Sequence, residues 1–228
     1  MRICVSIAAK NVDEALVQAR KTEPAADVIE IRLDSMEEPA VDSLIDKLAK
    51  PLLFTNRASW EGGLFEGAEE ARIAPLVSAV TQGASYVDLE MNAPVESRKR
   101  LLAALENRQS HLILSWHNFS LTPTRQELVG RLALMQDYGA HIGKIVTMAN
   151  DPCDTLRVLQ LQEEARKMDF PLICFSMGKA GVISRMATTM LGGYMTYCAV
   201  NREEATAPGQ LAVSDLRQIY EIAGLEDD

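Results

Sequence analysis

Apolar positions along the chain fall into short runs that alternate with longer amphipathic stretches. The short runs are rich in Val, Ile and Leu, and each predicts a buried strand. They cover residues 2–9, 28–34, 52–57, 86–91, 111–118, 142–149, 171–177 and 195–200. The stretches between them have helical spacing, with helices expected over residues 12–21, 41–49, 69–82, 95–107, 124–139 and 154–168. Strand alternates with helix along the chain, which is the order typical of parallel α/β folds.

The number of repeats distinguishes among the parallel α/β folds. Eight strand runs with seven or eight intervening helices, at about 28 residues for each unit, match a (β/α)8 TIM barrel, whose usual size is about 250 residues. A doubly wound open sheet is the main alternative. No linker-like segment or break in composition divides the chain, so we predict a single domain over residues 1–228. Segments 59–67 and 201–210 are expected to be active-site loops at the C-terminal face of the barrel.

Composition places the protein among ordinary globular chains, because 47% of its 228 residues are hydrophobic, 24% charged and 5% aromatic. The 32 acidic and 23 basic residues give a net charge of -9, which argues against a nucleic-acid partner. The four cysteines form no CxxC pair, so reduced thiols are predicted. The sequence shows neither a signal peptide nor an apolar run of about 18 residues, and we expect a cytoplasmic protein with no membrane partner.

Three charged residues alternate with apolar ones in the second strand run. Glu30, Arg32 and Asp34 lie on one face of a strand that is expected to be buried on both faces. An edge strand with a solvated charged face is the simpler reading of such alternation. The repeated strand and helix pattern favours the other interpretation, because a closed barrel has no edge. The three charges are then expected to face the barrel interior.

Lys144 lies within the otherwise apolar sixth strand run. An unpaired ammonium is costly in such surroundings, which favours the neutral amine. A neutral amine can attack a ketone to form a Schiff base, and the protonated imine then acidifies the neighbouring carbon. The alternative, equally supported by this strand alone, is a lysine that reaches the strand end or pairs with an inward carboxylate.

His117 falls at the end of the fifth strand run, the position from which catalytic side chains project in a barrel. Imidazole titrates near neutral pH, so His117 is expected to act as general acid and base. Glu90 ends the adjacent fourth run with Asp88 on the same face, and a carboxylate there is expected to orient His117. A lone histidine is more often structural, and we assign that role to His111 and His141.

Seven motifs, taken in order, resemble those of type I 3-dehydroquinate dehydratase, the Schiff-base enzyme of the shikimate pathway. They are EIRLD, TNRASWEGG, VDLEM, SWHNF, GKIVTM, FSMGKAGVISR and TAPGQ, and they extend over nearly the whole chain. The family is a (β/α)8 barrel that dehydrates 3-dehydroquinate to 3-dehydroshikimate without metal or cofactor, and its members are often homodimers. The resemblance implies this small-molecule substrate, a homodimer, and a chain that acts without a fused shikimate dehydrogenase domain.

The resemblance also implies roles for individual residues. Lys144 matches the lysine that forms the imine at carbon 3, and His117 matches the general acid and base that acts at carbons 2 and 1. Glu90 matches the carboxylate that supports His117. The remaining positions match substrate-binding groups: Glu30, Arg32 and Arg57 around the ring hydroxyls, Arg185 and Gln210 near the carboxylate, and Ser6, Met177 and Thr206 along the pocket. Thr206 stands where serine is common, and Tyr197 where phenylalanine is expected.

Two other functions fit part of this pattern. Another class I Schiff-base lyase or aldolase would share a strand lysine, but such barrels usually bind a sugar phosphate near the last two strands. The SWHNF histidine and the TAPGQ segment speak against that function. A barrel that only binds a metabolite is expected to have lost the lysine or the histidine, and the sequence has both.

Overall fold

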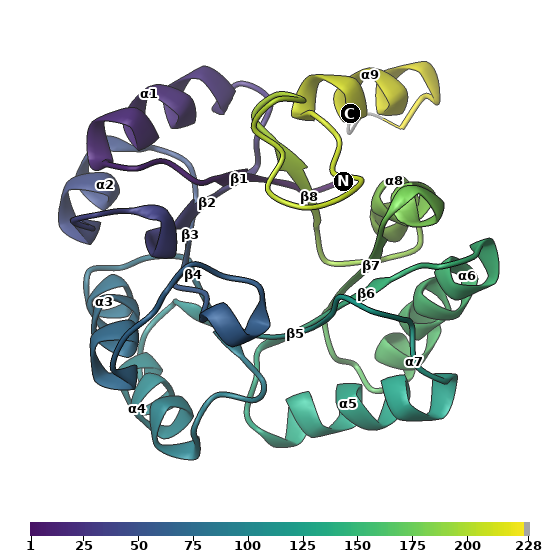
Figure 1. Ribbon diagram of the computed structural model, residues 1–228, viewed down its shortest axis with the longest axis horizontal. Coiled ribbons are helices and arrows are strands. Elements are labelled where there is room, and N and C mark those ends of the chain that lie inside the picture. The colour runs from purple at the N-terminus through teal and green to yellow at the C-terminus, as the bar shows by residue number, and fades with distance from the viewer. Residues whose placement is uncertain (226–228) are drawn as a thin grey trace.

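The computed structural model describes residues 1–225, which form a barrel of eight parallel strands surrounded by helices (Figure 1). The strands are hydrogen-bonded in the order β7-β6-β5-β4-β3-β2-β1-β8. Their bounds are β1 (Ile3–Ile7), β2 (Val28–Arg32), β3 (Leu52–Thr55), β4 (Tyr86–Glu90), β5 (His111–Asn118), β6 (Ile142–Met148), β7 (Leu172–Met177) and β8 (Thr196–Ala199). Neighbours in sequence are therefore neighbours in space, and β8 returns to pair with β1.

This strand order confirms the predicted barrel and excludes the doubly wound sheet, in which the order reverses partway across the sheet. The barrel is nearly closed, because β7 and β8 are the two ends of the hydrogen-bonded order. Across that seam the backbone N–H of Tyr194 donates to the carbonyl of Leu172 at 2.8 Å. The predicted domain reaches residue 228, and residues 226–228 lie outside the described part of the chain.

Helices cover the outside of the barrel. They are α1 (Val12–Thr22), α2 (Val41–Lys47), α3 (Glu69–Thr81), α4 (Val95–Leu105), α5 (Arg125–Asp137), α6 (Pro152–Leu159), α7 (Leu161–Lys167), α8 (Val182–Met190) and α9 (Val213–Ile222). Three short 3-10 helices follow strand ends: η1 (Leu33–Ser35), η2 (Ser59–Glu61) and η3 (Lys179–Gly181). The single helix predicted over 154–168 is wrong in one respect, because the chain breaks at Gln160 into α6 and α7.

Several helices begin at residues whose side chains satisfy free backbone N–H groups. The Asn11 side chain accepts from the N–H of Glu14 at the start of α1. Thr124 and Glu127 form a reciprocal capping box at the start of α5. Asp151 caps α6, with a proline at its first position. These local signals fix where helices begin, while the strands fix how they are arranged.

The apolar interior has two separate parts. The larger part lies between the strands and the helices, and the smaller part fills the barrel itself. Along five strands an inward apolar residue is followed two positions later by an inward polar one, which is the period expected of a strand. The apolar members are Val28, Leu53, Tyr86, Ile113 and Ile142, and the polar ones are Glu30, Thr55, Asp88, Ser115 and Lys144. An apolar floor therefore supports a buried polar layer.

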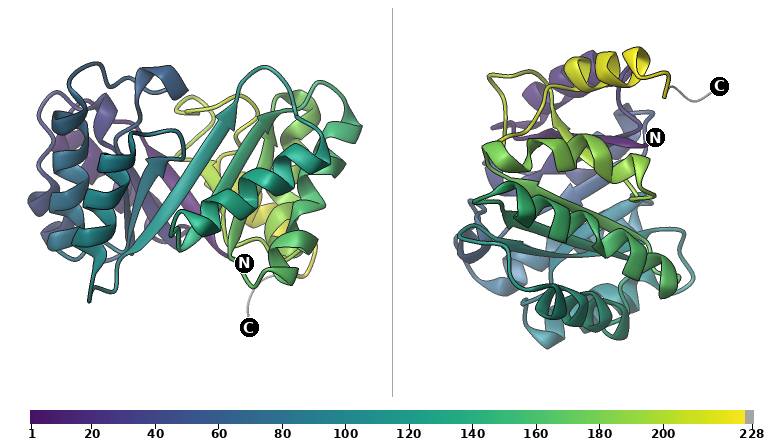
Figure 2. Two further views of the ribbon diagram at one scale, coloured as in Figure 1. Left: turned by 90° about the horizontal axis from the view of Figure 1, so that it is seen from below. Right: turned by 90° about the vertical axis from the view of Figure 1, so that its right-hand side faces the viewer.

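The polar layer lies nearer the C-terminal ends of the strands than the apolar floor does. The longer loops gather at the same end of the barrel (Figure 2). The segment between β3 and α3 and the segment between β8 and α9 both lie at this end, as expected for the active-site loops 59–67 and 201–210. Among residues 1–225, no helix is both long and apolar enough to cross a membrane.

Candidate active site

A pocket opens at the C-terminal end of the barrel. Side chains from several strands line it, together with the loop that precedes α9. Of the residues to which the sequence assigned a catalytic or substrate-binding role, all but Glu90 line this pocket: they are Ser6, Glu30, Arg32, Arg57, His117, Lys144, Met177, Arg185, Thr206 and Gln210. The fold thus collects positions that are far apart in the sequence around one cavity.

Lys144 lies in the middle of β6 and is only 4% exposed. Its Nζ donates to Oδ2 of Asp88 at 3.1 Å, and Oε1 of Glu30 lies 4.0 Å away. The ring of Tyr197 lies beside the ammonium, with 4.1 Å between Nζ and the ring centroid. Lys144 thus pairs with inward carboxylates and does not reach the strand end. The amine is therefore held in a fixed position at the wall of the pocket.

Asp88 is the centre of the buried polar layer beneath the pocket. It accepts hydrogen bonds from Nη2 of Arg57 at 2.8 Å and Oγ of Ser115 at 2.6 Å, in addition to the bond from Lys144. Burial by itself disfavours the charged carboxylate, but Arg57 and Lys144 outweigh it and hold the pKa of Asp88 below its ordinary value. Asp88 therefore stays ionised and fixes both cations.

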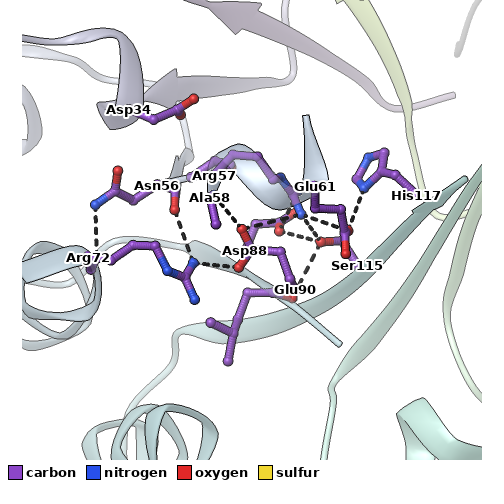
Figure 3. Close-up of polar contacts among 12 residues, drawn as sticks. Asp34, Asn56, Arg57, Ala58, Glu61, Arg72, Asp88, Glu90, Ser115 and His117 are labelled. Carbon is purple, nitrogen blue, oxygen red and sulfur yellow. Dashed lines mark hydrogen bonds and ion pairs between the residues drawn. The ribbon is translucent and has the colours of Figure 1, made fainter. Parts of the chain in front are cut away.

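His117 is in contact with a carboxylate, and that carboxylate is Glu61 (Figure 3). Nδ1 of His117 lies 2.9 Å from Oε1 of Glu61, and Phe119 stacks on the imidazole with ring centroids 5.9 Å apart. Burial, reinforced by the cations Arg57 and Lys144, lowers the pKa of His117 well below its ordinary value. Burial raises the pKa of Glu61 to about 8. In the described part of the chain Nε2 makes no hydrogen bond, so this nitrogen is available to a ligand.

The expectation that Glu90 orients His117 by direct contact is wrong. Oε1 of Glu90 accepts from the backbone N–H of Ala58 at 2.8 Å, and Oε2 accepts from Nη1 of Arg72 at 2.5 Å (Figure 3). Among residues 1–225, no contact joins Glu90 to His117. The physical reason is that the backbone and an arginine already use both oxygens of Glu90. Glu61 was missed, although it lies in segment 59–67 and directly precedes a Gly-Gly pair.

The loop after β3 is folded tightly around Ala58. The carbonyl of Ala58 accepts from the N–H groups of Glu61 at 3.1 Å and Gly63 at 3.0 Å. Gly62 has a φ of +75°, and a Cβ on Gly63 would lie 2.0 Å from the carbonyl oxygen of Arg57. Both positions therefore require glycine. The Gly-Gly pair is what allows η2 to direct Glu61 into the pocket.

Arg185, on α8, is a buried cation without an ion pair in the described part of the chain. It is 2% exposed, its Nη2 donates to the carbonyl of Pro208 at 3.3 Å, and its Nε has no hydrogen-bond partner. The guanidinium lies 4.5 Å from the centroid of the Phe175 ring. Burial lowers the pKa of Arg185 to about 10. A buried charge without compensation is costly, so an anion bound here would be strongly stabilised.

The charged face of β2 points inward, as predicted for Glu30 and Arg32. Glu30 accepts hydrogen bonds from the hydroxyl groups of Ser6 and Thr55, the latter at 2.8 Å. Arg32 forms two hydrogen bonds to Asp34, at 2.8 and 2.6 Å. Asp34 itself lies beyond the strand, in η1, rather than on the strand face. These groups supply hydrogen-bond donors and acceptors on one side of the pocket.

The loop before α9 covers another side of the pocket. Oε1 of Gln210 accepts from the backbone N–H of Thr206 at 2.8 Å and from its hydroxyl at 3.0 Å. The carbonyl of Pro208 accepts from the N–H of Gly178 at 3.4 Å, as well as from Arg185. The loop is therefore docked on the turn between β7 and α8 by its own polar groups.

The two remaining histidines lie together outside the pocket. The rings of His111 and His141 are 5.5 Å apart, and Nδ1 of His141 accepts from the backbone N–H of Leu112 at 3.0 Å. Over residues 1–225, no three His, Cys, Asp or Glu side chains are grouped so that they could hold a metal ion. Neither His111 nor His141 lines the pocket.

Comparisons with known proteins identify the family of this chain. The model of the type I 3-dehydroquinase family matches residues 3–227. A 3-dehydroquinate dehydratase of Desulfotalea psychrophila is 48% identical over 219 residues, covering 96% of each chain. One of Bacillus subtilis is 38% identical and covers 86% of this chain and 81% of that protein.

Solved structures give the same result. A type I 3-dehydroquinate dehydratase from Clostridium difficile superposes with a TM-score of 0.88 at 29% identity, covering 97% of this chain and 91% of that one. A 3-hexulose-6-phosphate synthase, at 17% identity and a TM-score of 0.62, shares the fold alone. Because the family model matches nearly every residue and close relatives are similar from end to end, the chain belongs to the type I 3-dehydroquinase family.

Proposed function

We propose that this protein dehydrates 3-dehydroquinate to 3-dehydroshikimate, a step of the shikimate pathway, through an imine formed on Lys144. The observation that carries this proposal is a single pocket lined by the buried lysine, by His117 with its carboxylate, and by the unpaired Arg185. These groups suit the loss of water from a β-hydroxy ketone that carries a carboxylate. They serve as electron sink, proton carrier and anion site.

Substrate binding is assigned to the groups around the pocket. Arg185 binds the substrate carboxylate, which neutralises a cation that has no ion pair in the described part of the chain. Gln210 and Thr206 close over that end of the ring from the docked loop. The remaining lining residues surround the ring and its hydroxyl groups: they are Ser6, Glu30, Arg32, Arg57 and Met177.

Imine formation is the first chemical step. Lys144 first loses one proton to His117, and the amine then attacks the carbon 3 ketone. A second proton moves from nitrogen to oxygen, and the imidazolium returns the first one to the same oxygen, which leaves as water. The product is a protonated imine, whose positive charge lies near Glu30, Asp88 and the face of the Tyr197 ring. These groups stabilise the cation that withdraws electrons from carbon 2.

Elimination follows on the same imidazole. Neutral His117 removes a proton from carbon 2, and the electron pair moves into the imine to give an enamine. The imidazolium then protonates the hydroxyl on carbon 1, which leaves as water while the conjugated imine forms again. Hydrolysis of that imine releases the product and returns Lys144. Glu61 holds Nδ1, so Nε2 performs the transfers, and such proton transfer contributes about 10²–10⁴-fold to the rate.

The imine is tested by mixing the protein with 3-dehydroquinate and borohydride, which reduces an imine to a stable adduct. Intact-mass and peptide-map analysis is expected to find a mass gain on the peptide that contains Lys144. Lys144→Ala should abolish both adduct and turnover, whereas Lys99→Ala, at an exposed lysine, should change neither. His117→Ala should still form the adduct but turn over very slowly. An unmodified wild-type protein, or conversion of a sugar phosphate instead, would overturn the proposal.

We also propose that the protein is a cytoplasmic homodimer and that residues 1–228 are one catalytic domain. The resemblance noted in the sequence supports the dimer, as do the exposed apolar side chains of Leu156 on α6 and Ile183 on α8, two helices in contact. Light scattering on the eluting protein should give twice the mass of one chain. A mass of one chain at micromolar concentration would contradict the dimer.

A further inference from the structure

Beside the Glu61–His117 pair lies a buried ion pair that the proposed mechanism does not use. Arg72 on α3 and Glu90 at the end of β4 are each 1% exposed, with 2.5 Å between Nη1 and Oε2 (Figure 3). Neither side chain lines the pocket. A buried ion pair is a weak source of stability, because desolvation offsets most of the attraction, but its geometry is demanding.

Arg72 is held in one orientation by several elements. Its Nε and Nη2 donate to the two oxygens of Glu69, each at 2.8 Å, and Ser97 on α4 donates to Glu69 in turn. Nη1 also donates to the carbonyl of Asn56, while Nδ2 of Asn56 donates to the carbonyl of Arg72 at 2.8 Å. The guanidinium is thus fixed to α3, to α4 and to the end of β3.

Glu90 transmits this fixed position to the loop after β3. Its Oε1 accepts from the N–H of Ala58, whose carbonyl accepts from the N–H of Glu61. The Glu61 side chain then contacts His117. A continuous series of hydrogen bonds therefore runs from Arg72 through Glu90 and the loop to the imidazole.

We infer that Arg72 and Glu90 are positioning residues for the acid and base step, because together they fix the loop that places Glu61 against His117. This inference rests on the proposed function and adds to it a pair that touches neither substrate nor the reacting atoms. Misplacement of a catalytic group by about 1 Å costs as much as 100-fold in rate. Loss of the pair should therefore lower turnover more than binding.

The charge of Glu90 also acts on Glu61. Burial is the main cause that raises the pKa of Glu61, Arg57 at 3.3 Å opposes it, and the carboxylates Glu90 and Asp88 raise it further. His117 faces Glu61 from β5. Removing the negative charge of Glu90 takes away one influence that raises the pKa of Glu61 and leaves Arg72 paired with Glu69 alone. Both changes lower the pKa of Glu61. In Glu90→Gln the titration midpoint of Glu61 should therefore move to lower pH, a change that simple loss of stability would not produce.

The variants Glu90→Gln and Arg72→Lys test the inference in the full-length protein. Both should fold, with circular dichroism like that of the wild type, and both should lose between about 10- and 100-fold in kcat while KM changes less than about threefold. Gln162→Met is the matched control, since Gln162 is a buried side chain hydrogen-bonded to Thr188 elsewhere in the barrel. It should keep wild-type kcat.

Titration of the imidazole supplies the second readout. The chain has 3 histidines, so spectra of protein labelled with ¹⁵N-histidine are simple, and His117→Ala identifies the signal of His117. In the wild type this signal should change as Glu61 titrates near pH 8. In Glu90→Gln the midpoint of this signal change should move to lower pH. In Gln162→Met the midpoint should equal that of the wild type.

The outcomes separate this inference from the function on which it rests. Borohydride should still trap the Lys144 adduct in both variants, because the amine is untouched. If the wild type forms no adduct, the proposed function fails. If it does, and Glu90→Gln and Arg72→Lys both keep wild-type kcat and midpoint, only the positioning role is refuted. An equal loss in Gln162→Met would also refute it, and Arg72→Lys decides the matter should Glu90→Gln not fold.

Discussion

Arg185 carries a charge that the described part of the fold leaves uncompensated. Among residues 1–225, its Nε has no hydrogen-bond partner, and its guanidinium makes one hydrogen bond, to the carbonyl of Pro208. Removing an unpaired buried cation relieves a desolvation cost that folding must otherwise meet. A residue of this kind lowers the stability of the free protein while it prepares the site for an anion.

Replacing Arg185 with methionine should therefore separate stability from binding. We expect Arg185→Met to raise the free energy of unfolding by about 1–3 kcal/mol, measured by urea denaturation without ligand. The KM for 3-dehydroquinate should rise about 100-fold, because a charge-assisted pair with the carboxylate is lost. Arg202→Met, at an exposed arginine paired with Asp215, serves as the control. A less stable Arg185→Met with unchanged KM would contradict this account.

Glu61 makes stability depend on pH. Its pKa is about 8 in the fold, above its ordinary value of 4.5, because burial disfavours the carboxylate. Below pH 4.5 both the folded and the unfolded chain hold the proton. Between pH 4.5 and 8 only the unfolded chain releases it, so this contribution to stability falls as pH rises, by at most about 1.4 kcal/mol for each pH unit.

Glu61→Gln removes that titration. The difference in unfolding free energy between Glu61→Gln and the wild type should grow in favour of the variant from pH 5 to pH 8, while kcat falls. Urea denaturation at three pH values measures the trend, and the constant loss of hydrogen bonds to His117 and Arg57 does not affect its slope. Glu96→Gln, at an exposed glutamate, should show no trend. A flat difference would show that Glu61 is ionised in the fold at neutral pH.

At the scale of elements, strands are predictable from the sequence in a way that loops are not. The period of two along a buried strand is enough to turn Glu30, Lys144 and His117 inward, and all three line the pocket. The eight apolar runs likewise predicted the barrel. The role of Glu61 was not predicted, because its position depends on backbone hydrogen bonds at Ala58 that the pattern of side chains does not reveal. The break between α6 and α7 was missed because helix-forming residues continue across it.

The loop after β3 can be tested through its second glycine. Gly63→Ala should lower kcat by 10-fold or more, because its Cβ would lie 2.0 Å from the Arg57 carbonyl and the backbone must shift Glu61 away. Gly130→Ala in α5 is the control, where a Cβ meets nothing within 4 Å. It should keep full activity and raise stability by about 0.5–1 kcal/mol. Steady-state kinetics and thermal denaturation decide the comparison, and normal kcat in Gly63→Ala would mean the loop tolerates the shift.

At the scale of the whole molecule, the fold protects its thiols. Cys4, Cys174 and Cys198 are buried and Cys153 is exposed, and none of the four is paired. Burial raises the pKa of Cys174 and of Cys198 to about 12, which suppresses the reactive thiolate. Three cysteines are therefore inert as long as the barrel is intact.

A disulfide reagent that reports free thiols should show this protection directly. We expect one thiol in each native chain to react rapidly at pH 8, and four to react in denaturant without prior reduction. Cys153→Ser should remove the rapid phase and leave the other three unchanged. Rapid reaction of two or more thiols in the native protein would indicate that the barrel opens readily.

The seam between β7 and β8 is where the barrel is expected to open most easily. The hydrogen-bonded order of strands ends there, whereas every other neighbouring pair forms a ladder. Helix α8 joins the two edges of the seam, and the hydroxyl of Thr196 on β8 bonds the carbonyl of Arg185 on that helix at 2.7 Å. An anion bound by Arg185 would therefore stabilise the junction between β7 and β8. Bound substrate then holds this junction closed. Hydrogen exchange of the backbone amides in residues 172–199 should slow when substrate binds.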